Sequence, residues 1–165
     1  MKLSDLAALP LTYPEVGATA GPMPAGYHHV TESAVIGSGR ARFDEAATAV
    51  MRWGMLRGAG VRVRATTEIA EVGSEVIVGL GPVQAPCRVV YVVDEPDRRG
   101  FAYGTLPGHA EIGEELFAVR YDPASGRVYA EVAAFSRHGT WWSRLAGPVT
   151  SVLQRVVTRR YLRAL

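Results

Sequence analysis

Apolar and polar positions along this chain follow two different periods, one typical of a helix and one typical of strands. In residues 41–56 (ARFDEAATAVMRWGML) apolar and small side chains recur every three or four positions, which predicts an amphipathic helix. Its expected buried stripe consists of Phe43, Ala46, Ala47, Val50, Met51 and Gly54. The glycines of residues 57–60 are expected to end this helical segment, in which a short second helix is left open. Residues 27–37, before it, carry β-branched side chains and predict a first strand.

After residue 60 the period changes to two, and turn-forming residues separate the alternating runs. Strands are expected at residues 61–69, 74–81, 87–95, 100–108, 114–122 and 127–137. Short connections such as residues 96–100 (PDRRG) and 123–126 (PASG) join them. Strands that follow each other through short turns pair in an antiparallel way, so the sequence predicts a mostly antiparallel sheet.

The tail returns to the helical period over residues 148–165. The expected apolar stripe consists of Val149, Val152, Leu153, Val156, Val157, Tyr161 and Leu165, and the arginines of the segment lie largely off it. A lone terminal helix must bury its stripe against the sheet. We therefore expect an α+β fold in which a curved seven-stranded antiparallel sheet grips a long C-terminal helix and encloses space beside it.

The first 26 residues are rich in proline and glycine, which oppose regular structure. We expect residues 1–26 to form an extended arm on a single domain of residues 27–165. Asp5 and Pro10 interrupt any apolar run at the start, so a signal peptide is not expected. No apolar run approaches the roughly 20 residues of a membrane-spanning helix. The sequence favours a soluble, cytoplasmic protein.

Composition narrows the classes of function. Hydrophobic residues make up 48% of the 165 residues, enough for a real core, and the net charge of +2 points to no nucleic-acid partner. Lys2 is the sole lysine among 18 basic residues, and the abundance of Arg, Ala, Gly and Val is typical of a GC-rich bacterial genome. A single cysteine, Cys87, excludes a disulfide framework and is expected to be a small buried hydrophobe. We expect neither a metal site nor a cofactor.

The side chains that could take part in binding or catalysis are concentrated in residues 100–117 (GFAYGTLPGHAEIGEELF). An eight-residue connection, residues 106–113, is expected between two strands, with His109 at a turn near the rim of the sheet. His109 could exchange protons at a pKa near neutrality, with Glu111 or Glu115 orienting it. The interpretation that the sequence favours is that His109 caps the turn by hydrogen bonding, while Glu114 is solvated.

Glu115 is the more informative carboxylate, because it shares a strand face with Phe117 and other apolar residues and needs a partner if it is buried. Arg88 and Arg137 are the candidate partners. Such a Glu–Arg pair could orient a ligand carboxylate or carbonyl, or it could simply brace the sheet. The expected ligand-binding residues are Arg88, Tyr103, Thr105, His109, Glu115, Phe117, Glu131 and Arg137.

Seven blocks carry a family resemblance across almost the whole chain. They are LTYPEVGAT, GYHH, VIGSGRARFDEAATAVMRWGM, CRVVYVVDE, GFAYGTLPGHAEIGEELF, AFSR and RLAGPVTSVLQRVVTRRYLRAL. The chain resembles the DUF1990 family, also called UPF0548, and the order of its elements is similar to the helix-grip fold of the START/Bet v 1-like (SRPBCC) superfamily. Ala110 and His138 stand where the family commonly has proline. The family's function is unknown, so the resemblance implies a fold and no activity.

Three hypotheses of function remain open on the sequence. The favoured one is a module that binds a hydrophobic or lipid-like small molecule in a cavity between sheet and C-terminal helix. The first alternative is an enzyme of cyclase or hydrolase type that uses His109 and Glu115 as acid and base. The second is a module that docks a protein or, peripherally, a membrane through the proline-rich arm and the basic helix. The sequence does not distinguish a monomer from a homodimer.

Overall fold

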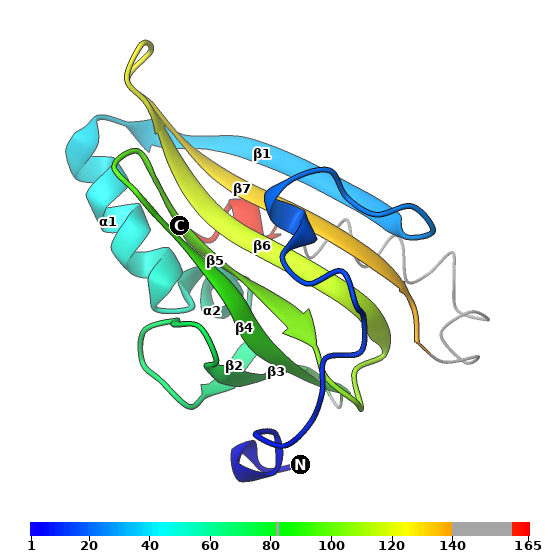
Figure 1. Cartoon of the computed structure of the whole chain (residues 1–165). Coiled ribbons are helices and arrows are strands. Elements are labelled where there is room, and N and C mark those ends of the chain that lie inside the picture. The colour runs from blue at the N-terminus through cyan, green and yellow to red at the C-terminus, as the bar shows by residue number, and fades with distance from the viewer. Residues whose placement is uncertain (82, 140–159) are drawn as a thin grey trace.

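Seven antiparallel strands form one curled sheet that organises the molecule (Figure 1). The structure, a computed structural model, describes residues 1–81, 83–139 and 160–165. The strands are β1 (His28–Ser38), β2 (Arg62–Ala65), β3 (Glu75–Leu80), β4 (Val83–Glu95), β5 (Arg98–Thr105), β6 (Glu111–Asp122) and β7 (Arg127–His138). Their order in the sheet is β1-β7-β6-β5-β4-β3-β2, so the first strand pairs with the last.

This order confirms the predicted α+β helix-grip fold. Strand β1 is followed by two helices, and the six later strands follow each other as a meander. Residues 160–162 form a helical turn that lies on the same side of the sheet as these helices. Most of the predicted C-terminal helix, residues 148–165, lies outside the described residues.

Helices α1 (Arg40–Met51) and α2 (Gly54–Gly58) cover one side of the sheet, which we call the inner face. The predicted stripe of α1 is buried, with Phe43, Ala46, Ala47 and Val50 in the core. The helical segment expected over residues 41–56 is divided in two at Trp53, which adopts a left-handed backbone conformation with φ 65°. Its indole is 1% exposed and packs edge-on against Phe101, with ring centroids 4.9 Å apart. Burial of this ring accompanies the break between the two helices.

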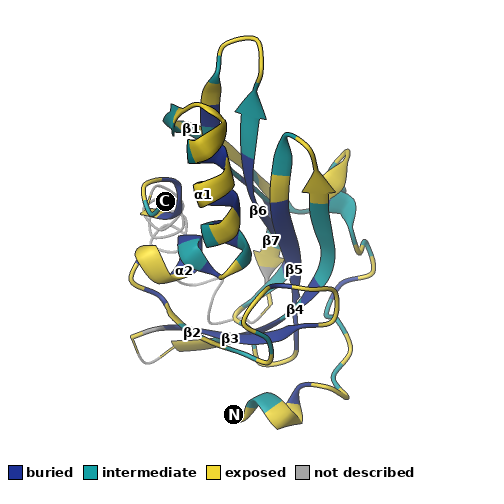
Figure 2. Cartoon of the chain, turned by 90° about the vertical axis from the view of Figure 1, so that its left-hand side faces the viewer, coloured by how far each residue is buried: buried dark blue, intermediate teal, exposed yellow. Residues whose placement is uncertain are grey.

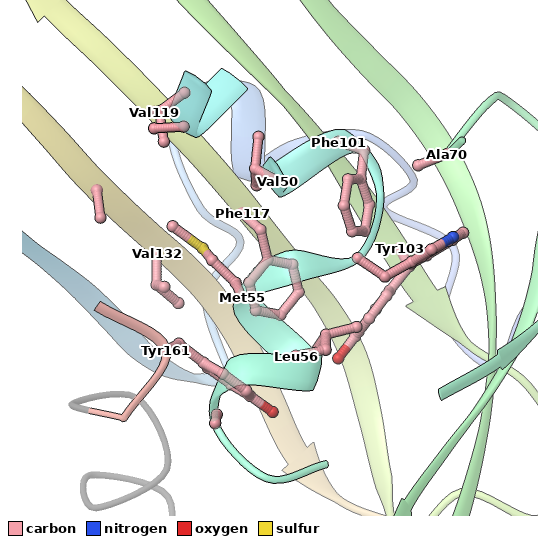
Figure 3. Packing of buried hydrophobic residues seen from close by; sticks show 14 of the residues in the cluster. Val50, Met55, Leu56, Ala70, Phe101, Tyr103, Phe117, Val119, Val132 and Tyr161 are labelled. Atoms are coloured by element: carbon pink, nitrogen blue, oxygen red, sulfur yellow. The ribbon is translucent and has the colours of Figure 1, made fainter. Parts of the chain in front are cut away.

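The main core lies between the inner face and the two helices. Figure 2 shows buried residues concentrated where α1 lies over β5 and β6. In Figure 3 the rings of Phe101 and Phe117 lie between the strands and the side chains of Val50 and Met55. Tyr161, from the C-terminal turn, closes the cluster with its ring edge-on to Phe117 at 5.2 Å. The helices and the C-terminal turn therefore bury the inner face from the same side.

The opposite side of the sheet, the outer face, carries the N-terminal arm of residues 1–26 (Figure 1). The arm contains two short 3₁₀ helices, η1 (Leu3–Asp5) and η2 (Ala18–Ala20). Leu6 packs with Ile77 and Leu106 in a small apolar cluster of its own. A second cluster beneath the arm includes Ala102, Leu116 and Ala118, so strands β5 and β6 bury side chains on both faces.

Several element boundaries differ from the sequence prediction; β4, for example, begins at Val83 rather than at residue 87. The strand expected over residues 61–69 ends at Ala65, because the following segment turns away and the Ala70 N–H donates to the Met51 carbonyl at the end of α1. The connection between β5 and β6 covers residues 106–110 rather than the expected 106–113, because β6 begins at Glu111. In the described part of the chain, no helix is long and apolar enough to cross a bilayer.

Candidate ligand-binding site

The registers of β4, β5, β6 and β7 place four side chains in one row across the inner face. Val89 is opposite Tyr103, Tyr103 is opposite Glu115, and Glu115 is opposite Ala134. Because side chains alternate along each strand, these residues share the inner face with the core aromatic rings. The row thus brings Glu115 and Tyr103, both predicted site residues, into direct contact.

Glu115 is a carboxyl group surrounded by apolar and phenolic neighbours. The Tyr103 hydroxyl donates a hydrogen bond to Glu115 Oε2 at 3.1 Å, and Tyr103 itself is 6% exposed. Burial raises the pKa of Glu115 from 4.5 to about 7, and the nearby charge of Glu111 acts in the same direction. At neutral pH this carboxyl group is therefore close to half protonated, a state suited to binding or to proton exchange.

Cys87 and Tyr161 complete the polar groups around Glu115. Cys87 is fully buried on β4, as the sequence predicts, and burial raises the pKa of its thiol well above the usual value. Burial also raises the pKa of the Tyr161 and Tyr103 hydroxyls, and the charge of Glu115 adds to this effect in all three groups. The thiol and both phenols consequently stay neutral, and they contribute hydrogen-bonding atoms but no charge.

A small pocket opens beside Glu115, where β5 ends and β6 begins, and we call it the Glu115 pocket. Its volume is about 40 Å³. It is lined by Tyr103, Thr105, His109, Glu111, Gly113, Glu114, Glu115, Ala134, Phe135 and Ser136. Four of the predicted site residues, Tyr103, Thr105, His109 and Glu115, therefore meet at one place.

His109 lies in the turn between β5 and β6, where the sequence places it. The Glu111 N–H donates to His109 Nδ1 at 2.9 Å, and the His109 N–H donates to the Leu106 carbonyl at 3.1 Å. Burial lowers the pKa of the imidazole from 6.5 to about 4. The expected pKa near neutrality is wrong, because the desolvation of the ring outweighs the effect of its hydrogen bond with the Glu111 backbone. His109 caps the turn as a neutral acceptor.

Thr105 and Phe117, the other predicted residues on this side, have structural contacts. Thr105 Oγ1 accepts from the Gly113 N–H at 3.0 Å and lies 2.5 Å from Thr12 Oγ1 in the arm. A side chain at Gly113 would place its Cβ 1.9 Å from the Phe135 carbonyl oxygen, so glycine allows β6 to approach β7 here. Phe117 is fully buried in the core. Thr105 thus fixes the rim of the pocket, and Phe117 supports its base.

Arg88 does not pair with Glu115, which corrects the first of the two expected partnerships. Its side chain lies on the outer face, where Nη2 is 2.9 Å from Glu75 Oε1. The same guanidinium donates to the carbonyls of Leu6 at 2.7 Å and Leu9 at 2.9 Å. Arg88 is one residue out of phase with the inner-face row, so it holds the arm instead of facing the pocket.

Glu131 and Arg137 also face outward, which corrects the second partnership. Glu131 pairs with Arg98 at 3.0 Å and with Arg120 at 2.7 Å. The Arg137 guanidinium lies 5.1 Å from the centre of the Tyr27 ring. For these arginines and for Arg88, the structure matches the alternative of groups that brace the sheet and its arm.

Glu114 is a well-bonded residue whose role the sequence reasoning missed. It is 3% exposed, so the expectation that it is solvated is wrong. Its carboxylate accepts from the Tyr13 hydroxyl at 2.6 Å, the Gly17 N–H at 2.7 Å and the Thr19 N–H at 3.0 Å, and also from the Thr19 hydroxyl. Four donors from the arm therefore meet on one carboxylate of β6.

The position of the Tyr13 side chain on the outer face explains why residue 104 of β5 is a glycine. A Cβ at Gly104, which is paired with Glu114 across the strands, would lie 2.2 Å from the Tyr13 hydroxyl oxygen. Only a residue without a side chain leaves room for this ring on the outer face. The sequence signal that another segment covers the outer face was the pairing of a glycine, Gly104, with a glutamate, Glu114, in neighbouring strands.

Curated relatives share long segments with this chain. A UPF0548 protein from Deinococcus radiodurans is 50% identical over 78 residues, which cover 47% of this chain and 39% of that protein. A UPF0548 protein from Arabidopsis thaliana is 28% identical over 135 residues, covering 76% of this chain and 65% of the relative. The matched segments thus span from about two fifths to two thirds of the length of these relatives.

Among solved structures, a hypothetical protein from Helicobacter pylori has a similar fold with a TM-score of 0.63. The two sequences are 8% identical, and the superposition covers 93% of this chain and 94% of the other. This likeness concerns the fold alone. The family model described as "Domain of unknown function (DUF1990)" matches residues 12–164, which include most of the arm, the whole sheet and the Glu115 pocket. The chain therefore belongs to the DUF1990 family.

Proposed function

We propose that this protein binds a small, largely hydrophobic molecule on the inner face of its sheet, with Glu115 and Tyr103 as the polar anchors. The rest of the inner face offers aromatic and aliphatic contacts, among them Phe117 and Tyr161. Ligand sites commonly combine such an apolar lining with a few convergent polar groups. The proposal follows the helix-grip fold and the position of one half-buried carboxyl group, that of Glu115, within it.

The observation that carries the proposal is the setting of Glu115. Removing a carboxyl group from water is costly unless it is neutralised or hydrogen-bonded, and the cost appears here as the raised pKa. One hydrogen bond from Tyr103 offsets little of this cost. Glu114, the adjacent residue, shows how this strand supports a buried carboxylate structurally, with four donors. A ligand that supplies donors to Glu115 would complete the site.

Native mass spectrometry of the freshly purified protein tests the proposal. We expect a mass above that of the bare chain, which returns to the bare mass when the protein is denatured. The Tyr103→Phe and Glu115→Leu variants should lose the adduct, whereas Glu71→Gln, an exposed carboxylate in the loop before β3, should keep it. If the protein carries no adduct and binds no member of a panel of hydrophobic compounds, the proposal fails.

Proton transfer is a second candidate, supported by one observation. A carboxyl group with a pKa of about 7 is matched to acid–base catalysis near neutral pH. The partner expected from the sequence, His109, is a poor one, because its pKa is about 4 and its Nδ1 already accepts a hydrogen bond. A catalytic version therefore rests on Glu115. If the ligand recovered by mass spectrometry is converted by the wild type and also by Glu115→Gln, that version fails.

The contacts of the arm with the sheet oppose the hypothesis that the arm is a free segment that docks a partner. Residues 1–26 are held on the outer face by the bonds to Glu114 and by Arg88. Docking of a partner through the arm would have to break these buried contacts. The basic part of the tail lies mostly outside the described residues, so a peripheral membrane role of the helix is open to the liposome test: flotation that persists at low salt and disappears at high salt would support it.

A further inference from the structure

The chemical character of the Glu115 pocket determines which ligand groups it can accept. An arginine beside Glu115 would favour a ligand carboxylate, but Arg88 and Arg137 both lie on the outer face. Among the residues that the structure describes, the groups around Glu115 on the inner face are neutral donors and acceptors, such as the Tyr103 hydroxyl and the Cys87 thiol. A ligand anion would meet like charge from Glu115, whereas a cation would meet opposite charge.

The groups that surround Glu115 come from every neighbouring element among the described residues. Glu111 lies on the same strand, Tyr103 on β5, Cys87 on β4, Tyr161 in the C-terminal turn and His109 in the connecting loop. Glu111 adds negative charge, and the tyrosines and the cysteine are neutral. His109 is neutral above about pH 5, because its pKa is about 4. Among the described residues, Glu115 is therefore the group whose charge a ligand head group in the pocket would meet directly.

The size of the pocket selects a compact group. Its volume of about 40 Å³ is far below the roughly 300–1,000 Å³ of pockets that enclose a whole ligand, so it has room for a small head group only. A primary ammonium group is similar in size to water and carries three N–H donors, whereas a trimethylated ammonium is larger and has none. Donors of a cation to a carboxylate make the shorter and stronger hydrogen bonds. The rings of Tyr103 and Tyr161 add favourable contacts with positive charge.

We propose that the ligand carries a primary ammonium group that binds Glu115 beside Tyr103, while its apolar body lies along the inner face. This inference rests on the proposed function and names the chemical class of its ligand. The Glu115 carboxylate and the Tyr103 hydroxyl oxygen accept hydrogen bonds from the ammonium group. The apolar body contacts the side chains that also form the inner-face core.

A dependence of affinity on pH follows from the same geometry. The ammonium group needs the ionised form of Glu115, and burial raises the pKa of this carboxyl group to about 7. Below that pH a proton must leave before the cation can bind. Affinity should therefore rise between pH 6 and pH 8, a range in which an alkyl ammonium group stays protonated. His109 does not contribute, because it remains neutral throughout this range.

Calorimetric titration with three matched probes tests the inference. The probes are 2-phenylethylamine, 2-phenylethanol and 3-phenylpropionate, which share an aromatic body and differ in the charge of the head group. At pH 8 we expect the amine to bind at least about tenfold more tightly than the alcohol, and the acid to bind most weakly. At pH 6 the advantage of the amine should shrink by several fold.

Variants assign the preference to Glu115. Glu115→Gln should bind the amine and the alcohol with similar affinity at both pH values, and Glu115→Asp should keep the preference in weakened form. Glu71→Gln, which removes an exposed carboxylate elsewhere, should behave as the wild type does. Thermal melts of each variant show that it is folded, so that a loss of preference cannot come from unfolding.

The outcomes separate the two proposals. If all three probes bind with equal affinity, the ammonium inference is wrong and the binding function stands. If the amine is preferred but Glu115→Gln keeps that preference, another group is the anchor and the inference is wrong. If no probe binds and the purified protein also carries no adduct, the binding function fails together with the inference.

Discussion

Glu114 and Glu115 are adjacent in the chain, yet their carboxyl groups lie on opposite faces of the sheet. Glu114 is buried and accepts hydrogen bonds from Tyr13, Gly17 and Thr19. Glu115 accepts one from Tyr103, and burial dominates its ionisation. The same residue type thus fixes a structural contact on one face and remains available for a ligand on the other.

At the scale of single residues, Glu115 should make stability depend on pH in a defined direction. Its folded pKa of about 7 exceeds the usual 4.5, so the folded state holds the proton more tightly than the unfolded state does. Stability is therefore lost as pH rises from 4.5 to 7. Glu115→Gln removes this loss and should be more stable than the wild type at pH 8, by up to about 3 kcal/mol, but not at pH 4.5.

Urea denaturation of both proteins at pH 4.5 and pH 8 measures this difference. Glu71→Gln serves as the control for the loss of an exposed charge and should change stability by less than about 0.5 kcal/mol. An unfolding free energy of Glu115→Gln that equals the wild-type value at both pH values would show that Glu115 is ionised normally in the folded protein.

His109 should make the stability of the folded protein depend on pH in the direction opposite to that of Glu115. Burial lowers its folded pKa to about 4, below the usual 6.5, so the folded protein loses stability as pH falls from 6.5 to 4. In an NMR titration the ring carbon signal of His109 should move with a midpoint near pH 4, and the exposed ring of His28 provides a reference in the same spectrum. A midpoint near 6.5 for His109 would contradict its description as a buried, neutral cap.

At the scale of elements, the local periods of the sequence were sufficient for most strands and for α1. Alternation and turn residues predicted β3, β4, β5, β6 and β7, and the stripe of Phe43, Ala46, Ala47 and Val50 predicted the buried side of α1. A short second helix was left open, but the position of the break at Trp53 was not predicted, because a left-handed backbone at a tryptophan has no local signal. The indole of Trp53 packs on Phe101, which is distant in the sequence.

The arm shows why some contacts are hidden from a local analysis. The bond between Tyr13 and Glu114 joins residues 101 positions apart, and that between Thr12 and Thr105 joins residues 93 positions apart. Composition predicted that residues 1–26 would lack regular structure, but no period could indicate that Glu114 would hold them. The assignment of Glu114 to solvent was wrong for this reason.

Removal of the Glu114 carboxylate should release the arm. In Glu114→Gln an amide N–H₂ replaces one acceptor oxygen and faces N–H and O–H donors, which we expect to cost about 2–4 kcal/mol. Limited proteolysis with chymotrypsin measures the release, because it should cleave the variant after Leu11 much faster than the wild type. Tyr13→Phe, which removes one of the four bonds, should have an intermediate effect. Equal cleavage of wild type and Glu114→Gln would contradict the anchoring role.

At the scale of the whole molecule, the fold class followed from the order of elements, whereas the location of the site depended on which sheet face points inward. The sequence left this open because β6 buries side chains on both sides, with Phe117 and Val119 inside and Leu116 and Ala118 outside. Half of the predicted site residues consequently meet at the Glu115 pocket, while Arg88, Glu131 and Arg137 lie on the other face.

The two faces of the sheet have different roles. The outer face is covered by the arm and held by ion pairs, and the inner face carries the helices, the core and the Glu115 pocket. Both faces of the sheet carry tyrosines that can serve as probes. The outer face has Tyr13, Tyr27, Tyr91 and Tyr129, and the inner face has Tyr103 and Tyr161. A ligand should therefore affect the two groups differently.

Fluorine NMR of protein labelled with 3-fluorotyrosine tests this division most directly. The seven tyrosines give separate signals, which single Tyr→Phe substitutions assign. When 2-phenylethylamine is added at pH 8, the signals of Tyr103 and Tyr161 should shift in a saturable way, and those of the four outer-face tyrosines should stay in place. Saturable shifts confined to the outer-face tyrosines would contradict the account.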